Sequence, residues 1–166
     1  MKYMRLNTQQ QQDFLSQLAS MANYLEQAFS GLGPEDQIRN GVDGSFSPIE
    51  HIWHLADLEQ QGFAQRIHRL QTEICPDLED FAGARIAREG NYKQRSWTRG
   101  LEEFRKARNA NLAILRKLDE QQWLRRGTQH GVGPISMCDM PSLMAEHDDS
   151  HRNEITAWLD WLAASG

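Results

Sequence analysis

Apolar residues recur along this chain at the spacing of helices rather than that of strands. Between Thr8 and Ser30 they step by four, three, four and three residues, which puts one apolar stripe on a helix: Phe14, Leu18, Met21, Leu25 and Ala28. Gly31, Gly33 and Pro34 follow and predict the end of that helix. No run of β-branched residues alternates with polar ones, so no strand is expected.

A second helix is predicted from Ser47 to about Glu73, and its start is the clearest in the chain. Ser47 can cap the helix, and Pro48 suits the first helical position because the nitrogen there needs no hydrogen. Glu50 can reach back to the backbone of Ser47 and close a capping box. This start therefore sets the register of the second helix.

Two more helices are predicted, from about Thr98 to Trp123 and from between Ser136 and Pro141 to about Ala163. About 22 residues with little pattern separate the second and third helices, which is long for a compact domain. A helix of about 26 residues spans about 40 Å, and a link of this size can return over that length. We therefore expect an all-α, four-helix bundle in up-down-down-up order, in which residues 1–166 form one domain.

Composition excludes several classes of protein. The net charge of −5 makes extensive phosphate binding unfavourable, so no nucleic-acid partner is expected. No apolar run approaches the roughly 20 residues that span a bilayer, so no membrane partner is expected either. The two cysteines, Cys75 and Cys138, are too few for a disulfide scaffold and fit a reducing compartment. We expect a cytoplasmic protein.

Positive charge is concentrated in one stretch. Residues 85–117 carry ten Lys or Arg and three acidic residues, a net charge of +7. This stretch is either a solvated surface or an anion-attracting wall beside a pocket. Within it, Arg108 interrupts the apolar side of the third helix between Phe104 and Leu112. Arg108 therefore either pairs with a carboxylate or orients an anionic substrate.

The strongest chemical signal is a pair of histidines on the fourth helix. His147 and His151 are four residues apart, which places both imidazoles on one face. They belong to a stripe that should face the bundle interior: Met144, His147, His151, Ile155, Trp158 and Leu162. Buried ring nitrogens need partners, and one divalent metal ion would satisfy both histidines. Hydrogen bonds to other helices are the alternative.

A catalytic metal site needs a third ligand and an open position. The second helix offers His51 and His54, and both lie roughly opposite its main apolar stripe, so periodicity does not choose between them. His54 has Leu58 one turn later. His68 and His130 are interpreted as surface or loop residues.

Two other classes of metal site fit less well. Metalloprotease helices carry glutamate after the first histidine, whereas Asp148 follows His147 here. Di-iron bundles need Glu-x-x-His on two helices, and only Asp148-x-x-His151 comes close.

Two segments resemble the DinB-like family of damage-inducible metalloenzymes. Ser47-Pro48 through His54-Leu55-Ala56-Asp57-Leu58-Glu59 resembles the second helix of that family, and Glu146-His147-Asp148-Asp149-Ser150-His151 is similar to the fourth. The resemblance covers nearly the whole chain in element order. It implies a four-helix bundle with a long crossover, often dimeric, and a divalent metal ion, often nickel or zinc. It also implies that His54, His147 and His151 are the ligands. The family name refers to DNA damage and does not imply DNA binding.

We therefore expect a divalent-metal-binding protein that acts as a metal-dependent enzyme on a small molecule. A three-histidine centre lowers the pKa of bound water or of a bound thiol. This predicts either a hydrolase or an S-transferase that uses a low-molecular-weight thiol. Arg108 and His51 are the candidate residues of the substrate pocket. The alternative is a non-catalytic metal- or ligand-binding protein involved in the stress response. Since protons compete for imidazoles, metal affinity is expected to fall below about pH 6.5.

Overall fold

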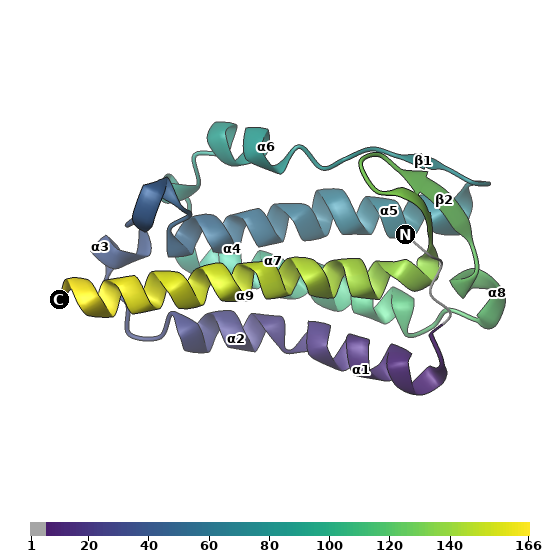
Figure 1. Cartoon of the computed structure of the whole chain (residues 1–166), viewed down its shortest axis with the longest axis horizontal. Helices are drawn as coiled ribbons and strands as arrows, with labels where there is room; N and C mark the ends of the chain where they lie inside the picture. Colours follow the sequence, from purple (N-terminus) through teal and green to yellow (C-terminus); the bar gives the residue numbers. More distant parts are fainter. Residues whose placement is uncertain (1–5) are drawn as a thin grey trace.

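The computed structural model describes residues 6–166, which form an elongated bundle of four long helical segments (Figure 1). The first segment is α1 (Thr8–Ala19) followed by α2 (Met21–Ala28), and the second joins α4 (Pro48–Asp57) to α5 (Ala64–Thr72). A π-helical turn, η2 (Leu58–Phe63), lies between α4 and α5. The third segment is α7 (Trp97–Leu115) and the fourth is α9 (Met140–Ser165). The predicted helical bundle is confirmed.

The long crossover between the second and third segments is also confirmed. In Figure 1, α4–α5 and α7 run in one direction, whereas α1–α2 and α9 run in the other. The crossover carries β1 (Asp77–Leu78), α6 (Gly83–Glu89) and η3 (Tyr92–Gln94) back along the bundle. α4 packs against α7, and α1 packs against α9. The order is therefore up-down-down-up.

A small sheet at one end of the bundle was not expected. Its order is β1-β2-β3, with β2 at Arg126–Gln129 and β3 at Gly133–Ser136. β1 pairs with β2 in parallel, and β2 pairs with β3 in the antiparallel sense. The expectation of no strand was wrong because these strands are two to four residues long and mostly polar, Gly or Pro. Their pairing comes from tertiary contacts, and the sheet ties the crossover to the loop before α9.

Local capping explains where the helices begin and end. The Ser47 N–H donates to Glu50 Oε2 at 2.8 Å, as the predicted capping box requires. Pro141 lies in the first turn of α9, so it opens that helix. The third helix ends at Leu115, earlier than predicted, because Asp119 caps a separate short helix, α8 (Glu120–Trp123). The Gln122 N–H donates to Asp119 Oδ1 at 2.8 Å.

Two apolar clusters fill the bundle. One gathers around Leu58, Phe63 and Met144, and the other gathers around Ile52 and Ile155. On α9 the histidines lie between residues of the two clusters, whereas on α4 they lie among residues of the second cluster. Three short elements, α3 (Pro34–Gln37), η1 (Val42–Gly44) and η4 (Met137–Asp139), complete the loops. Within residues 6–166 no helix is long and apolar enough to cross a membrane.

Candidate metal centre

Three histidines meet where α4 faces α9. His54, His147 and His151 each offer a ring nitrogen, and these atoms lie within 4.8 Å of one another. The ring centroids of His147 and His151 are 4.5 Å apart, and His54 lies 5.1 Å from His151 and 5.5 Å from His147. The Nε2 atoms of His147 and His151 are separated by 3.3 Å. The structure thus brings together the three residues that the family resemblance indicated.

His51 occupies a different position, behind His151. Its Nδ1 lies 2.8 Å from Nδ1 of His151, on the edge of that ring away from His147. Glu154 Oε2 is 4.0 Å from Nδ1 of His51 and 3.8 Å from Nδ1 of His151. The pair at 2.8 Å has the length of a hydrogen bond. His51 therefore supports the back of His151, whereas His54 lies in contact distance of both α9 histidines.

All four imidazoles are uncharged at neutral pH. Burial lowers the pKa of His51 to about 3, of His147 to about 4 and of His151 to about 2. Neighbouring imidazoles lower these three pKa values further. Burial also lowers the pKa of His54. Each ring therefore keeps a lone pair on one nitrogen, which is the form that binds a metal ion.

Arg108 lies in a buried ion-pair network rather than in a pocket. Its guanidinium donates to both carboxylate oxygens of Asp148, at 2.7 and 2.9 Å, and to the Leu18 carbonyl at 3.0 Å. Its Nε lies 3.0 Å from Glu59 Oε1. Each of its three nitrogens thus lies within 3.0 Å of a protein oxygen, although Nε makes no hydrogen bond of good geometry. Of the two roles considered for Arg108, the structure supports pairing with carboxylates, and the substrate-orienting role does not fit this placement.

The histidine cluster fits a divalent metal ion. Nδ1 of His54 and Nδ1 of His147 are buried and have no hydrogen-bond partner among residues 6–166. Two ligands bound to one tetrahedral ion at about 2.0–2.1 Å lie about 3.3–3.4 Å apart. The 3.3 Å between the Nε2 atoms of His147 and His151 matches that separation. Three neutral nitrogen donors at this spacing suit zinc and nickel.

The cluster opens onto a cavity of about 310 Å³, which we call the inner cavity. His54 and His147 form part of its wall, and the rest of the wall is both apolar and polar: Leu58, Phe63, Arg66, Asp80, Phe81, Gly83, Ala84, Gln129 and Leu143. Residues five apart share a face in a π turn, so η2 directs both Leu58 and Phe63 to this cavity. The His51 candidate for the substrate pocket is not among these lining residues.

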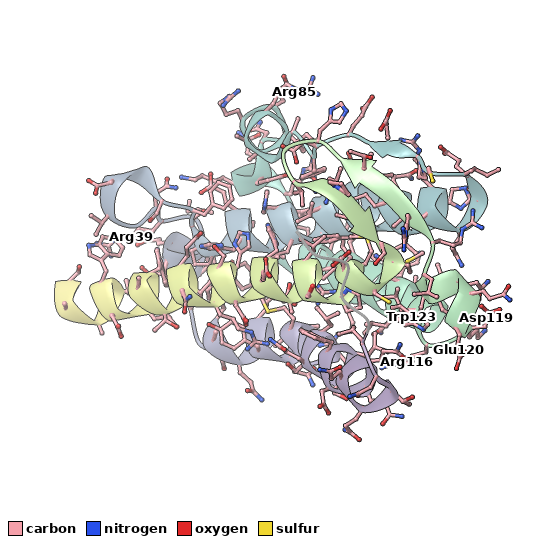
Figure 2. All side chains as sticks on the ribbon, turned by 45° about the vertical axis from the view of Figure 1, so that its right-hand side comes forward. Arg39, Arg85, Arg116, Asp119, Glu120 and Trp123 are labelled. Atoms are coloured by element: carbon pink, nitrogen blue, oxygen red, sulfur yellow. The ribbon has the colours of Figure 1, made fainter. Side chains whose placement is uncertain are left out.

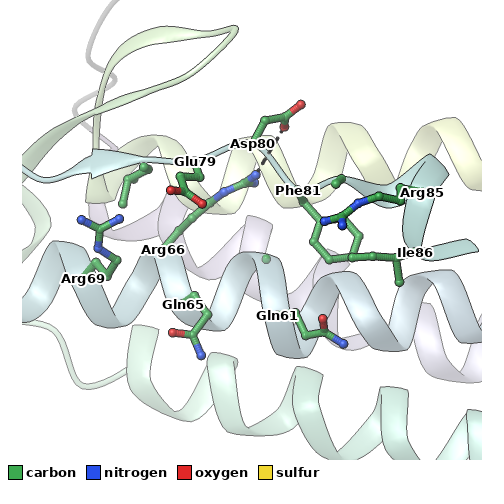
Figure 3. Close-up of a pocket in the computed structure, with 12 residues that line it drawn as sticks. Gln61, Gln65, Arg66, Arg69, Glu79, Asp80, Phe81, Arg85 and Ile86 are labelled. Atoms are coloured by element: carbon green, nitrogen blue, oxygen red, sulfur yellow. Dashed lines mark ion pairs between the residues drawn. The ribbon is translucent and has the colours of Figure 1, made fainter. Parts of the chain in front are cut away.

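The crossover forms one side of the inner cavity, through Asp80, Phe81, Gly83 and Ala84. Gly83 packs so closely on the second helical segment that a Cβ atom there would lie 2.8 Å from Cε1 of His54. On the outer side of Phe81 is a second groove of about 330 Å³, which Figure 3 shows between α5 and the crossover. Arg66 lines both cavities, and a dashed line in Figure 3 marks its ion pair with Asp80. Arg66 thus lies between the outer groove and the inner cavity.

The positively charged stretch, residues 85–117, does not form a single surface beside a pocket. Arg85 and Arg116 are both exposed and lie far apart on the bundle (Figure 2). Arg85 lines the outer groove, whereas Arg116 lies near α8. The solvated-surface interpretation therefore fits most of the stretch. Sequence reasoning missed Arg66, although its helix was predicted, because no motif marks it. It missed Gln129 because this residue lies on β2, a strand that no pattern predicted.

Comparisons with known proteins agree with this architecture. The family model of the DinB superfamily matches residues 17–155. Among solved structures, YfiT from Bacillus subtilis superposes with a TM-score of 0.84 and 18% identity, covering 97% of this chain and 94% of that one. YfiT is described as a probable metal-dependent hydrolase with an unusual four-helix bundle topology. At this identity the likeness shows the fold. No curated protein is significantly similar to the chain.

Proposed function

The chain belongs to the DinB superfamily, and we propose that it is a metal-dependent hydrolase whose ion is held by His54, His147 and His151. The observation that carries this proposal is the meeting of three neutral imidazoles, two of which, His54 and His147, line the inner cavity. Three protein ligands leave a position for water or substrate, whereas a structural ion is usually enclosed by four. The description of YfiT as a probable metal-dependent hydrolase supports the same reaction class.

The residues behind the ligands prepare the site. In our proposal, His151 donates its Nδ1 hydrogen to Nδ1 of His51, which lies 2.8 Å away. This tautomer leaves the lone pair of His151 on Nε2, next to Nε2 of His147. A bound divalent ion supplies Lewis acidity and lowers the pKa of water. The apolar side chains of the inner cavity limit the entry of other water molecules.

The ion proposed is zinc or nickel, because borderline nitrogen donors bind both. Thiol transfer is the second candidate reaction. An anionic low-molecular-weight thiol would find a cation, Arg66, on the wall of the inner cavity. A homodimer and a cytoplasmic location stay predictions.

Metal content of purified variants tests the ligand assignment. The protein is stripped with a chelator, reloaded with zinc or nickel and analysed by plasma mass spectrometry. We expect one ion per chain in the wild type and loss of the ion in His54→Ala and His147→Ala. His68→Ala, which removes an exposed imidazole, is the matched control. If His51→Ala loses the ion while His54→Ala keeps it, the ligand set is wrong.

Cobalt spectroscopy tests whether the centre can do chemistry. The cobalt form is titrated with imidazole, and its visible absorption should change as the new ligand joins the coordination sphere. An unchanged spectrum at high imidazole concentration means a closed centre and supports a non-catalytic metal-binding protein. If the spectrum changes, amide, ester and thiol-transfer substrates separate the two proposed reactions.

A further inference from the structure

Arg66 is a buried arginine whose donors are largely unused. The residue is 7% exposed and lies on the wall that the inner cavity shares with the outer groove. Its ion-pair partner is Asp80, whose carboxylate is 3.7 Å away and whose side chain is 76% exposed. Within the part of the chain that the structure describes, Arg66 has no closer acceptor. A guanidinium carries five N–H donors, so Arg66 has capacity for another anion.

Two other arginines have a protein oxygen close to each of their three guanidinium nitrogens. Arg69, one turn along α5, donates to both carboxylate oxygens of Glu73, at 2.7 and 2.8 Å, and to the Asp77 carbonyl at 2.7 Å. Arg108 lies 2.7 Å from a carboxylate oxygen of Asp148 and 3.0 Å from one of Glu59. Arg66 differs from both because its one carboxylate partner is exposed and lies beyond hydrogen-bond distance.

Gln129 adds a second unused polar group to the inner cavity. The residue is 6% exposed, and its Oε1 has no hydrogen-bond donor among residues 6–166. Its backbone position is set by the sheet, where it pairs with Leu78 on one side and Gly133 on the other. A buried acceptor without a donor is unfavourable, so Oε1 is suited to receive an N–H group from a ligand.

The inner cavity limits what such a ligand can be. Its volume of about 310 Å³ is at the lower end of the range of about 300–1,000 Å³ for small-molecule sites. Four large apolar side chains contribute to its wall: Leu58, Phe63, Phe81 and Leu143. A fitting ligand is therefore small and combines an anionic group, an N–H donor and a short apolar part.

We propose that the inner cavity binds an N-acyl amino acid, a small carboxylate that carries an amide N–H and a short apolar side chain. Arg66 receives the carboxylate, because its planar fork matches the two oxygens. Gln129 Oε1 accepts the amide N–H, and the acyl carbon faces His54 and His147. An ester of the same shape lacks the N–H and leaves Oε1 unpaired.

This inference rests on the proposed hydrolase and names its substrate class. Hydrolysis of such an amide forms a bond between the water oxygen and the acyl carbon and breaks the carbon–nitrogen bond. One water proton goes to the leaving amine, and the acyl group leaves as a carboxylic acid. The carboxylate on Arg66 is not changed by the reaction, so it serves to orient the substrate.

Calorimetric titration of the metal-free protein tests the binding step. The metal is removed because a divalent ion would itself attract a carboxylate. The probes are N-acetyl-L-leucine, the neutral N-acetyl-L-leucinamide and the ester analogue 2-acetoxy-4-methylpentanoate. The wild type should bind the first at least tenfold more tightly than the other two. Arg66→Gln should weaken binding of N-acetyl-L-leucine by about 10- to 100-fold, as for a lost hydrogen bond to a charged group, and leave the neutral amide unchanged.

Three further variants sharpen the test. Arg69→Gln is the matched control and should leave binding of all three probes unchanged. Arg66→Lys keeps the charge but not the fork, so binding of N-acetyl-L-leucine should weaken less than in Arg66→Gln. Gln129→Leu should remove the preference for the amide over the ester. Circular dichroism establishes that each variant is folded.

The proposal is overturned if Arg66→Gln and Arg66→Lys bind N-acetyl-L-leucine as tightly as the wild type. It is equally overturned if the wild type shows no saturable binding at millimolar concentration or binds the neutral amide as tightly. Zinc content, measured separately, distinguishes the two hypotheses. Arg66-dependent binding in a protein that takes up no zinc refutes the metal centre alone, whereas zinc uptake without Arg66 dependence refutes the carboxylate site alone.

Discussion

Lowering the pH from 7.5 to 5.5 should destabilise the metal-free protein. Burial holds the pKa of His51 at about 3, of His147 at about 4 and of His151 at about 2. In an unfolded chain histidine has a pKa of about 6.5. Between these values the unfolded state takes up protons that the folded state does not. Folding stability is therefore highest above pH 6.5 and is lost as the pH falls toward 4.

The size of the effect follows from the number of neutral histidines. Consider a histidine with a pKa of about 6.5 in the unfolded chain that stays neutral in the folded protein. Between pH 7.5 and 5.5 it lowers the free energy of unfolding by about 1.4 kcal/mol. Three such groups give about 4 kcal/mol, which is a large part of the 5–15 kcal/mol that stabilises an ordinary domain. Burial also lowers the pKa of His54, so this residue acts in the same direction.

Urea unfolding, followed by circular dichroism at pH 7.5, 6.5 and 5.5 with a chelator present, measures this loss. His147→Gln removes one of the groups, so its loss of stability over the same interval should be smaller by about 1.4 kcal/mol. His68→Gln replaces an exposed histidine and is the matched control. A free energy of unfolding that is constant over this interval, or an unchanged pH dependence in His147→Gln, would refute the argument.

Three other measurements follow from the site. Zinc affinity should begin to fall at a pH below 6.5, because the pKa of each ligand histidine is lowered; competition with a chromophoric chelator measures it. Arg108→Met should lower the free energy of unfolding in urea by about 3–5 kcal/mol, because two buried carboxylates lose their partner. Arg105→Met, which removes an exposed ion pair, should lower it by about 0–1 kcal/mol. Gly83→Val should weaken zinc binding in the chelator assay, since its Cβ would displace His54.

Several features could be predicted because they depend on local chemistry. The helical stripes follow from the 3.6-residue period, and the capping box at Ser47 follows from side chains that reach only three residues. The meeting of His147 and His151 on one face is a property of any helix with that spacing. Even the parallel crossover could be predicted, because chain length alone shows how far a linker can reach.

The choice between His51 and His54 needed more than periodicity. Both histidines lie opposite the apolar stripe of their helix, so the pattern favoured neither of them as the third ligand. Only the family resemblance indicated His54. The packing of α4 on α9 decides which ring meets the α9 pair and which lies behind it. A rotation of α4 that no local rule forbids would exchange these positions. The ligand role of His54 stays a proposal until metal content is measured.

Features that depend on contacts between distant residues were decided by the tertiary structure. Leu58 and Phe63 share the wall of the inner cavity because η2 adds a residue to one turn, and a sequence period cannot reveal such a turn. Arg66 and Gln129 are more than sixty residues apart, and they line one cavity because a short, mostly polar strand pairs with the crossover. The sequence alone determined the helices and the histidine pair, since those depend on neighbours along the chain. The folded chain decided the cavity, since its walls come from segments that only packing brings together.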